Sequence, residues 1–126
     1  MHGVITGLKV KDLFLVRKKR TIDFSPNLYY GEGLGSEDLE KLSEKLCTKP
    51  LLTNLFLLIL PENPSDQVDI LSSRYLAQPF YGEHPLKVVG IANSREDAIS
   101  LIIQMTEDCL AVRKDCLLRE FLQWQS

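Results

Sequence analysis

Residues 86–113 read LKVVGIANSREDAISLIIQMTEDCLAVR, and this stretch decides the fold. Its first part, Leu86–Ala92, is a short apolar run of the kind found in strands that are buried on both faces. Its second part carries apolar residues at spacings of three and four, which predicts a helix over 95–113. Asn93 and Ser94 separate the two parts, and Ser94 is a favoured helix N-cap. A buried strand followed directly by a helix predicts a helix packed on a sheet.

Three further segments complete the expected sheet and helices. The apolar run LFLLIL at 55–60 ends at two prolines and predicts a second buried strand. A leucine stripe at helical spacing predicts a helix over 36–47, with Ser36 as its N-cap. Leucines and a phenylalanine after Asp115 predict a last helix over 116–124.

The remaining segments predict less regular structure. Residues 4–16 read as extended, residues 21–24 as a second short strand, and Ser-Pro-Asn at 25–27 as a turn. Residues 66–76 fit either a short helix or a strand.

These elements predict an α/β or α+β layered sandwich. We expect a mixed sheet with central strands near 55–60 and 86–92, covered by the helices near 36–47, 95–113 and 116–124. A chain of 126 residues has the commonest size of one domain, and it contains no internal repeat, low-complexity tract or linker. Residues 1–126 are therefore expected to form a single domain.

The composition predicts a cytoplasmic protein with no membrane contact. The chain has three cysteines without a CxxC pair, and it has enough apolar residues to fold without disulfide bonds. Both features favour a reducing compartment. The longest apolar run has six residues, against roughly 20 for a membrane span, and the N-terminus lacks the pattern of a secretory signal. Two histidines and three scattered cysteines show no metal-ligand spacing, so neither a metal nor another cofactor is expected.

A candidate ligand site is predicted from the expected sheet. In open α/β sheets, ligands bind beyond the carboxyl ends of the strands. Glu62 and Asn63 follow the first buried strand, and Asn93, Ser94 and Arg95 follow the second. Asn93 would fix a polar ligand, and the amides after Ser94 with Arg95 would bind an anion. In the alternative interpretation, Ser94 only caps its helix and Arg95 is solvated.

Other motifs favour structural interpretations. The glycines at 31–35 precede a helix, but Glu37 and Asp38 would place negative charge where a phosphate would bind, which favours a plain loop. His84 lies beside Glu83, yet no serine or cysteine nucleophile can be assigned to it. No catalytic residue is therefore predicted, and an enzymatic role is disfavoured.

Two segments are candidate contact surfaces. Phe80 and Tyr81 lie in a predicted loop and Trp124 near the end of the sequence, and aromatic residues are enriched at interfaces. In the alternative interpretation, Phe80 and Tyr81 pack back onto the core and Trp124 anchors the last helix. Although the net charge is −2, residues 1–20 carry six basic residues and only one acidic residue. Four of the basic residues are consecutive, at 17–20. Such a run can bind the phosphate backbone of a nucleic acid, but it lacks interleaved aromatic residues. A solvated turn is therefore favoured over nucleic acid binding.

The segment 86–110, with VVGIA followed by SREDAISLI, resembles the C-terminal part of small bacterial proteins, particularly clostridial ones. In those proteins a VxGIA strand precedes a helix of the form xxEAxxLI. The resemblance covers roughly a quarter of the chain and its motif is structural. It implies close packing of helix on sheet at the glycine and alanine of the strand, and it brings no known activity.

Three functions follow as hypotheses. The first is a non-enzymatic bacterial accessory or binding module that self-associates, as a dimer, through its aromatic surfaces. The second is a small-molecule sensor or enzyme with its site at the strand ends. The third is a weak nucleic-acid binder that uses the basic N-terminal segment.

Overall fold

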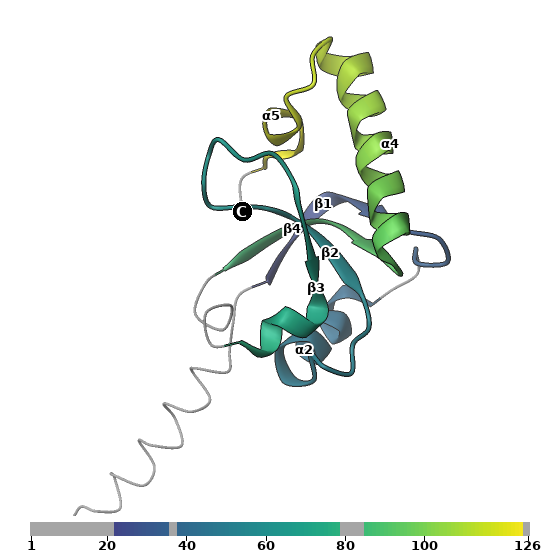
Figure 1. Cartoon of the computed structure of the whole chain (residues 1–126), viewed down its shortest axis with the longest axis vertical. Helices are drawn as coiled ribbons and strands as arrows, with labels where there is room; N and C mark the ends of the chain where they lie inside the picture. The colour runs from purple at the N-terminus through teal and green to yellow at the C-terminus, as the bar shows by residue number, and fades with distance from the viewer. Residues whose placement is uncertain (1–21, 36–37, 79–84, 125–126) are drawn as a thin grey trace, which may run out of the picture.

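The computed structural model describes residues 22–35, 38–78 and 85–124. Its elements are, in chain order, β1 (Ile22–Tyr30), α2 (Leu39–Thr48), β2 (Phe56–Leu60), β3 (Asp69–Ser72), the 3₁₀ helix η1 (Ser73–Ala77), β4 (Leu86–Ala92), α4 (Arg95–Arg113) and α5 (Leu118–Leu122). One face of the sheet is covered by α4 and α5, and the other by α2 and η1 (Figure 1).

The described strands form a mixed sheet in the order β1-β4-β2-β3. The two strands at its centre are β4 and β2, as the apolar runs at 86–92 and 55–60 predict. Strand β1 pairs in parallel with β4, whereas β2 is antiparallel to both β4 and β3. The predicted mixed α/β or α+β sandwich is therefore confirmed.

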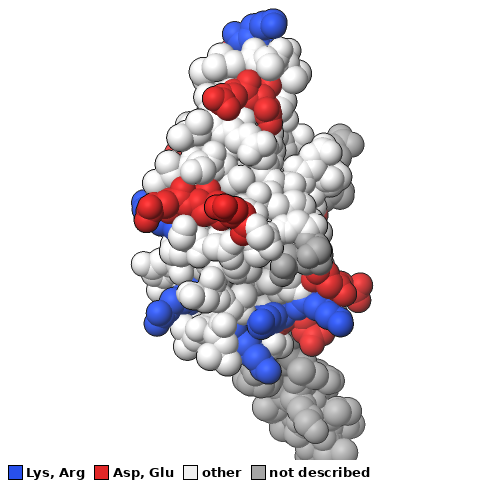
Figure 2. All heavy atoms as spheres, turned by 90° about the vertical axis from the view of Figure 1, so that its right-hand side faces the viewer, with Lys and Arg blue, Asp and Glu red and all other residues white. Residues whose placement is uncertain are grey.

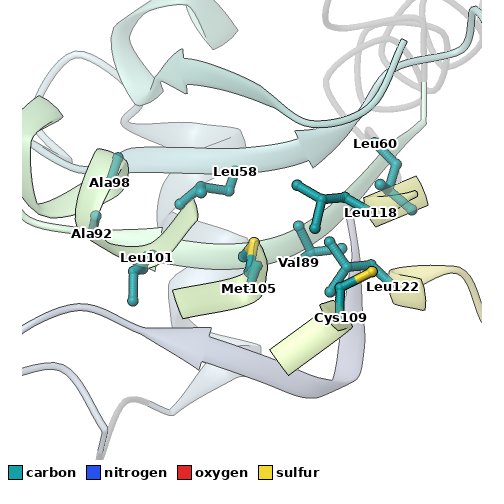
Figure 3. Packing of buried hydrophobic residues seen from close by; sticks show 10 residues of the cluster. All are labelled: Leu58, Leu60, Val89, Ala92, Ala98, Leu101, Met105, Cys109, Leu118 and Leu122. Carbon is teal, nitrogen blue, oxygen red and sulfur yellow. The ribbon is translucent and has the colours of Figure 1, made fainter. Parts of the chain in front are cut away.

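Neighbouring residues of the central strands point into two separate cores. On the α4 side, Leu58 and Val89 pack with buried residues of both helices: Ala98, Leu101, Met105, Cys109, Leu118 and Leu122 (Figure 3). On the other side, Leu57 and Val88 pack with Leu42, Leu46 and Leu76 of α2 and η1. This alternation explains why both central strands read as unbroken apolar runs.

Gly90 allows α4 to lie close to the sheet. A Cβ at this position would lie 3.1 Å from Leu58 Cδ1, 3.3 Å from Met105 Cε and 3.3 Å from the Tyr29 carbonyl oxygen. These distances leave no space for a side chain unless its neighbours shift. The glycine of the VVGIA strand is thus a close-packing position.

Strand β1 differs from the prediction of a short strand and a turn. Phe24 pairs with Val88 and Tyr29 with Gly90, so five steps along β1 match two steps along β4. The Ser-Pro-Asn segment at 25–27 forms this bulge, in which the Asn27 N–H donates a 3.0 Å hydrogen bond to Ser25 Oγ. Proline is tolerated there because a bulge leaves backbone donors unpaired. The turn residues therefore interrupt one strand and do not end it.

Several helix boundaries also differ from the predictions. Helix α2 begins at Leu39, and its N-cap is Asp38, whose carboxylate accepts hydrogen bonds from the N–H groups of Glu40 and Lys41 at 3.1 and 3.3 Å. Ser36, the predicted cap, lies outside the described residues, as does the segment 4–16. Residues 66–76 contain β3 followed by most of η1, so both interpretations of that segment are partly right.

Helix α4 spans Arg95–Arg113, as predicted. The last helix, α5, spans Leu118–Leu122 and is shorter than the predicted 116–124. The helix before it, α4, ends at a left-handed residue, Lys114 at φ 69°. The Asp115 carboxylate accepts a 3.1 Å hydrogen bond from the Leu117 N–H in the connection that follows.

Candidate functional site

The structure does not bring the five predicted ligand residues together. Because β2 is antiparallel to β4, Leu60 pairs with Lys87 at the start of β4, and Phe56 pairs with Ala92 at its end. Glu62 and Asn63 therefore follow β2 at one end of the sheet, while residues 93–95 follow β4 at the opposite end. Carboxyl ends meet at one edge only in parallel strands, and the sequence did not reveal this reversal.

The parallel pair β1 and β4 does bring its carboxyl ends together, and Asp97 joins them. Its carboxylate accepts hydrogen bonds from the Glu32 N–H at 3.2 Å and from the Asn93 N–H at 3.1 Å. The Asn93 side-chain amide donates to the Glu32 carbonyl oxygen. The Gly31 N–H donates a 2.7 Å bond to the carbonyl oxygen of Ile91. Asp97 and Asn93 thus hold the two loops to each other.

Ser94 caps α4, as predicted. Its hydroxyl oxygen accepts a 3.0 Å hydrogen bond from the Asp97 N–H. In a capping box the Asp97 carboxylate would accept a hydrogen bond from the Ser94 N–H, but here it accepts one from the Asn93 N–H, one residue earlier. Arg95 is exposed. This geometry agrees with the alternative interpretation of the segment, in which its polar groups shape the fold.

At the other end of the sheet, Asn63 and Glu62 have different surroundings. The Asn63 side-chain oxygen accepts hydrogen bonds from the Ser65 N–H at 3.1 Å and from the Ser65 hydroxyl at 2.9 Å, which forms a turn. Glu62 lines a cavity of about 510 Å³ beside the start of β1 and β4. The cavity is lined by Ile22, Asp23, Leu60, Pro61, Glu62, Pro85, Leu86, Lys87, Arg119 and Gln123.

The cavity carries charges of both signs. Asp23 and Glu62 supply carboxylates, while Lys87 and Arg119 supply cations. The Arg119 guanidinium also donates a 3.2 Å hydrogen bond to the Asp66 carbonyl oxygen, which fixes one side of the opening. The volume falls in the range of small-molecule sites, roughly 300–1,000 Å³.

Trp124, predicted as an interface residue, packs onto the protein itself. Its side chain is half-buried against the core cluster on the α4 side. The Lys87 Nζ lies 5.3 Å from the centroid of its ring and 3.4 Å from its carbonyl oxygen. Trp124 therefore anchors the segment that follows α5. The other predicted contact residues, Phe80 and Tyr81, lie outside the described residues, as do the basic run at 17–20 and His84.

Tyr29 and Cys109, on the α4 side of the sheet, have raised pKa values. The Tyr29 hydroxyl donates a 2.6 Å hydrogen bond to the Asp108 carboxylate, and burial together with this bond raises the pKa of Tyr29 well above its usual value. Burial also raises the pKa of Cys109, whose thiol donates to the Asp115 carbonyl oxygen at 3.2 Å. Both contacts tie α4 to its neighbours, and a neutral thiol is a poor nucleophile.

The feature that the sequence analysis missed is a second apolar face on α4. Ile99, Ile103 and Leu110 are 46%, 55% and 44% exposed, although Ala98, Leu101, Met105 and Cys109 are buried on the inner face. Together with the partly exposed Thr106, these three residues form what we call the outer stripe of α4. Figure 2 shows this side of the molecule, where uncharged surface separates two acidic groups.

A signal for the outer stripe is present in the sequence. Ile99, Ile103, Thr106 and Leu110 follow one another at intervals of four, three and four residues, so they share a helix face. The inner residues have similar spacing, and the two sets together look like one long helical pattern. Only the packing of α4 on the sheet separates them.

Comparisons with protein-family models, with curated proteins and with solved structures find no match. The resemblance of segment 86–110 to small bacterial proteins stays a prediction. Within ranges 22–35, 38–78 and 85–124, no helix is long and apolar enough to cross a bilayer. In the same residues, no three His, Cys, Asp or Glu side chains gather where they could hold a metal ion.

Proposed function

We propose that the protein is a non-enzymatic bacterial binding module that self-associates through the outer stripe of α4. The observation that carries this proposal is the exposure of Ile99, Ile103 and Leu110 on a helix whose opposite face is already buried. A helix that is apolar on both faces is typical of one that is covered on both sides. A second protein surface would cover the outer one.

Other apolar side chains on the α4 side of the sheet are only partly buried. Phe56 of β2 and Ile70 of β3 are half-buried apolar residues that pack against the same core cluster. Each additional apolar side chain that a partner covers contributes roughly 25 cal/mol per Å² removed from water.

The roles of the polar side chains at the end of β4 support a binding module over an enzyme. Asp97 and Asn93 hold backbone groups of the neighbouring loops, and Ser94 caps α4, as their hydrogen bonds of 3.0–3.2 Å and the Asn93–Glu32 contact indicate. Cys109, which is buried, and Cys116, which is exposed, carry free thiols, and free thiols support a location in a reducing cytoplasm.

Sedimentation velocity of purified variants tests this proposal. Ile103→Glu places a charge at the centre of the outer stripe and should shift the protein toward the monomer, because burying an unpaired carboxylate is costly. Leu52→Glu is the matched control, since Leu52 is 74% exposed in the connection between α2 and β2. Equal association of both variants and the wild type would contradict the role of the stripe.

A second candidate function is favoured by the cavity at the other end of the sheet. Its charges of both signs suit a small zwitterionic molecule, in which an ammonium group would bind Asp23 and a carboxylate would bind Lys87. Native mass spectrometry on protein purified from its own host without a metal column tests this candidate. A retained small molecule that is lost in a Lys87→Met variant would support it, and a protein of bare chain mass would oppose it.

A further inference from the structure

The outer stripe of α4 is flanked by opposite charges at its two ends. Glu96 precedes Ile99 by three residues, and Arg113 follows Leu110 by three residues. The six positions Glu96, Ile99, Ile103, Thr106, Leu110 and Arg113 are thus separated by three, four, three, four and three residues. This series of intervals reads the same in both directions.

Such a pattern is complementary to itself when two copies of the helix run antiparallel. A two-fold axis through the middle of the stripe places Ile99 opposite Leu110 of the second copy and Ile103 opposite Thr106. The same axis places each Glu96 opposite an Arg113. Three-four spacing is the geometry in which side chains of two helices interdigitate along a common seam.

A parallel arrangement would be unfavourable for the same residues. It would place Glu96 against Glu96 and Arg113 against Arg113, and like charges at an interface repel. It would also align the two helix dipoles, whereas an antiparallel pair sets the positive end of each helix beside the negative end of the other. The distribution of charge therefore selects one orientation.

We propose that two copies of this chain dock along the outer stripes of their α4 helices, antiparallel, with Glu96 of each copy paired to Arg113 of the other. This inference rests on the proposed self-association and specifies its surface, partner and register. The interface is isologous, so it closes at two copies and does not continue into a filament.

Arg113 is available for this contact. Its Nε and Nη2 donate hydrogen bonds of 3.1 and 3.3 Å to the two carboxylate oxygens of Asp115, which orients the guanidinium, and 36% of the side chain stays exposed. A guanidinium has five N–H donors, so it can bind Asp115 and a carboxylate of the second copy together. Figure 2 shows basic side chains at the top of this view, on the side where α4 ends in Figure 1.

The length of the outer stripe limits the expected affinity of the dimer. From Glu96 to Arg113 the helix rises about 26 Å, at 1.5 Å per residue. One helix face of this length gives an interface near or below the lower limit of stable complexes, about 1,200 Å² in total. We therefore expect a reversible dimer with a dissociation constant in the micromolar range, roughly 1–100 μM.

Charge reversal with mixing tests the register. Glu96→Arg makes both ends of the stripe positive, and Arg113→Glu makes both ends negative. Each variant alone should dimerise about tenfold more weakly than the wild type, because two attractive contacts per dimer become repulsive. An equimolar mixture of the two variants should recover wild-type association as a heterodimer, which native mass spectrometry identifies by its mass.

Glu40→Arg is the matched control for Glu96→Arg. Glu40 is also an acidic residue in the first turn of a helix, but α2 lies on the other face of the sheet. This variant carries the same penalty at a helix N-terminus and should dimerise like the wild type. Circular dichroism of every variant reports whether α4 stays folded. If a charge-reversal variant unfolds α4, the neutral variants Glu96→Gln and Arg113→Gln take its place. Each neutral variant alone should then weaken dimerisation.

The outcomes separate this inference from the proposed function. In one outcome the wild type dimerises, but the charge-reversal variants associate as strongly as it does, or their mixture does not recover wild-type association. Either result overturns the antiparallel register but leaves self-association in place. A wild-type chain that stays monomeric overturns both. Weak single variants with a recovered mixture support the proposed pairing.

Discussion

The carboxylate of Asp97 in the first turn of α4 accepts a 3.2 Å hydrogen bond from the backbone N–H of Glu32, which lies just after β1. This contact joins the ends of the two parallel strands. Gly31, the residue before Glu32, lies so close to this carboxylate that an added Cβ would be 2.0 Å from Asp97 Oδ2 and 3.0 Å from the Ala92 Cα. Position 31 therefore requires a glycine, because the Asp97 carboxylate and the β4 backbone approach it so closely.

Gly31→Ala should destabilise the fold by about 1–3 kcal/mol, because the new methyl group must displace Asp97 from its hydrogen bonds. Urea unfolding of the variant measures this loss. Gly35→Ala is the matched control, since a Cβ at Gly35 meets no atom within 4 Å, and its effect should stay within about 0.5 kcal/mol. Similar stability of the two variants would show that the contact at Gly31 is not tight.

Leu58→Ala should cost about 2–5 kcal/mol of unfolding free energy, because it leaves a cavity in the core on the α4 side. Leu58 is fully buried on an inner strand between β4 and β3. Leu52→Ala removes the same atoms from an exposed position and should change stability by less than about 0.5 kcal/mol. A loss below about 1 kcal/mol at Leu58 would contradict a central position for β2.

Tyr29→Phe should destabilise the protein by about 0.5–1.5 kcal/mol near neutral pH, through loss of the hydrogen bond to Asp108. The pKa of Tyr29 is raised in the folded state by burial and by this carboxylate. The stability that its neutral hydroxyl contributes is therefore complete below about pH 10, the unfolded pKa, and is lost as the pH rises toward the folded pKa.

The difference in stability between wild type and Tyr29→Phe should accordingly narrow above about pH 10. Urea unfolding at about pH 8 and about pH 11 measures it. Tyr75→Phe is the control, because it removes a hydroxyl from an exposed tyrosine. A difference that stays constant or widens between the two pH values would contradict the proposed linkage.

The elements that the sequence predicted best are those with uniform local signals. The two apolar runs became β2 and β4, and the stretch after Ser94 became α4 with the predicted ends. At Ser94 the cap, the acidic first turn and the helical spacing agree, so local chemistry alone settles the boundary. At Ser36 a comparable cap was expected, but Asp38 supplied it two residues later.

The candidate site depended on information that local patterns do not contain. Glu62 and Asn93 both follow buried strands, and nothing near either residue shows that β2 runs against β4. Strand direction is set by the connections and by the packing of the whole sheet. In the same way, Ile103 and Met105 are both apolar helical residues, and only the position of the sheet decides that Met105 is buried while Ile103 is exposed.

If the outer stripe of α4 binds a second copy of this chain, the mass of the wild-type protein in solution rises with its concentration. Sedimentation equilibrium should be measured from about 1 μM to about 1 mM, a range that brackets the expected dissociation constant. Pairing through α4 predicts a rise from the chain mass of 14.4 kDa toward twice that value, with no larger species. A mass of 14.4 kDa at every concentration would contradict it.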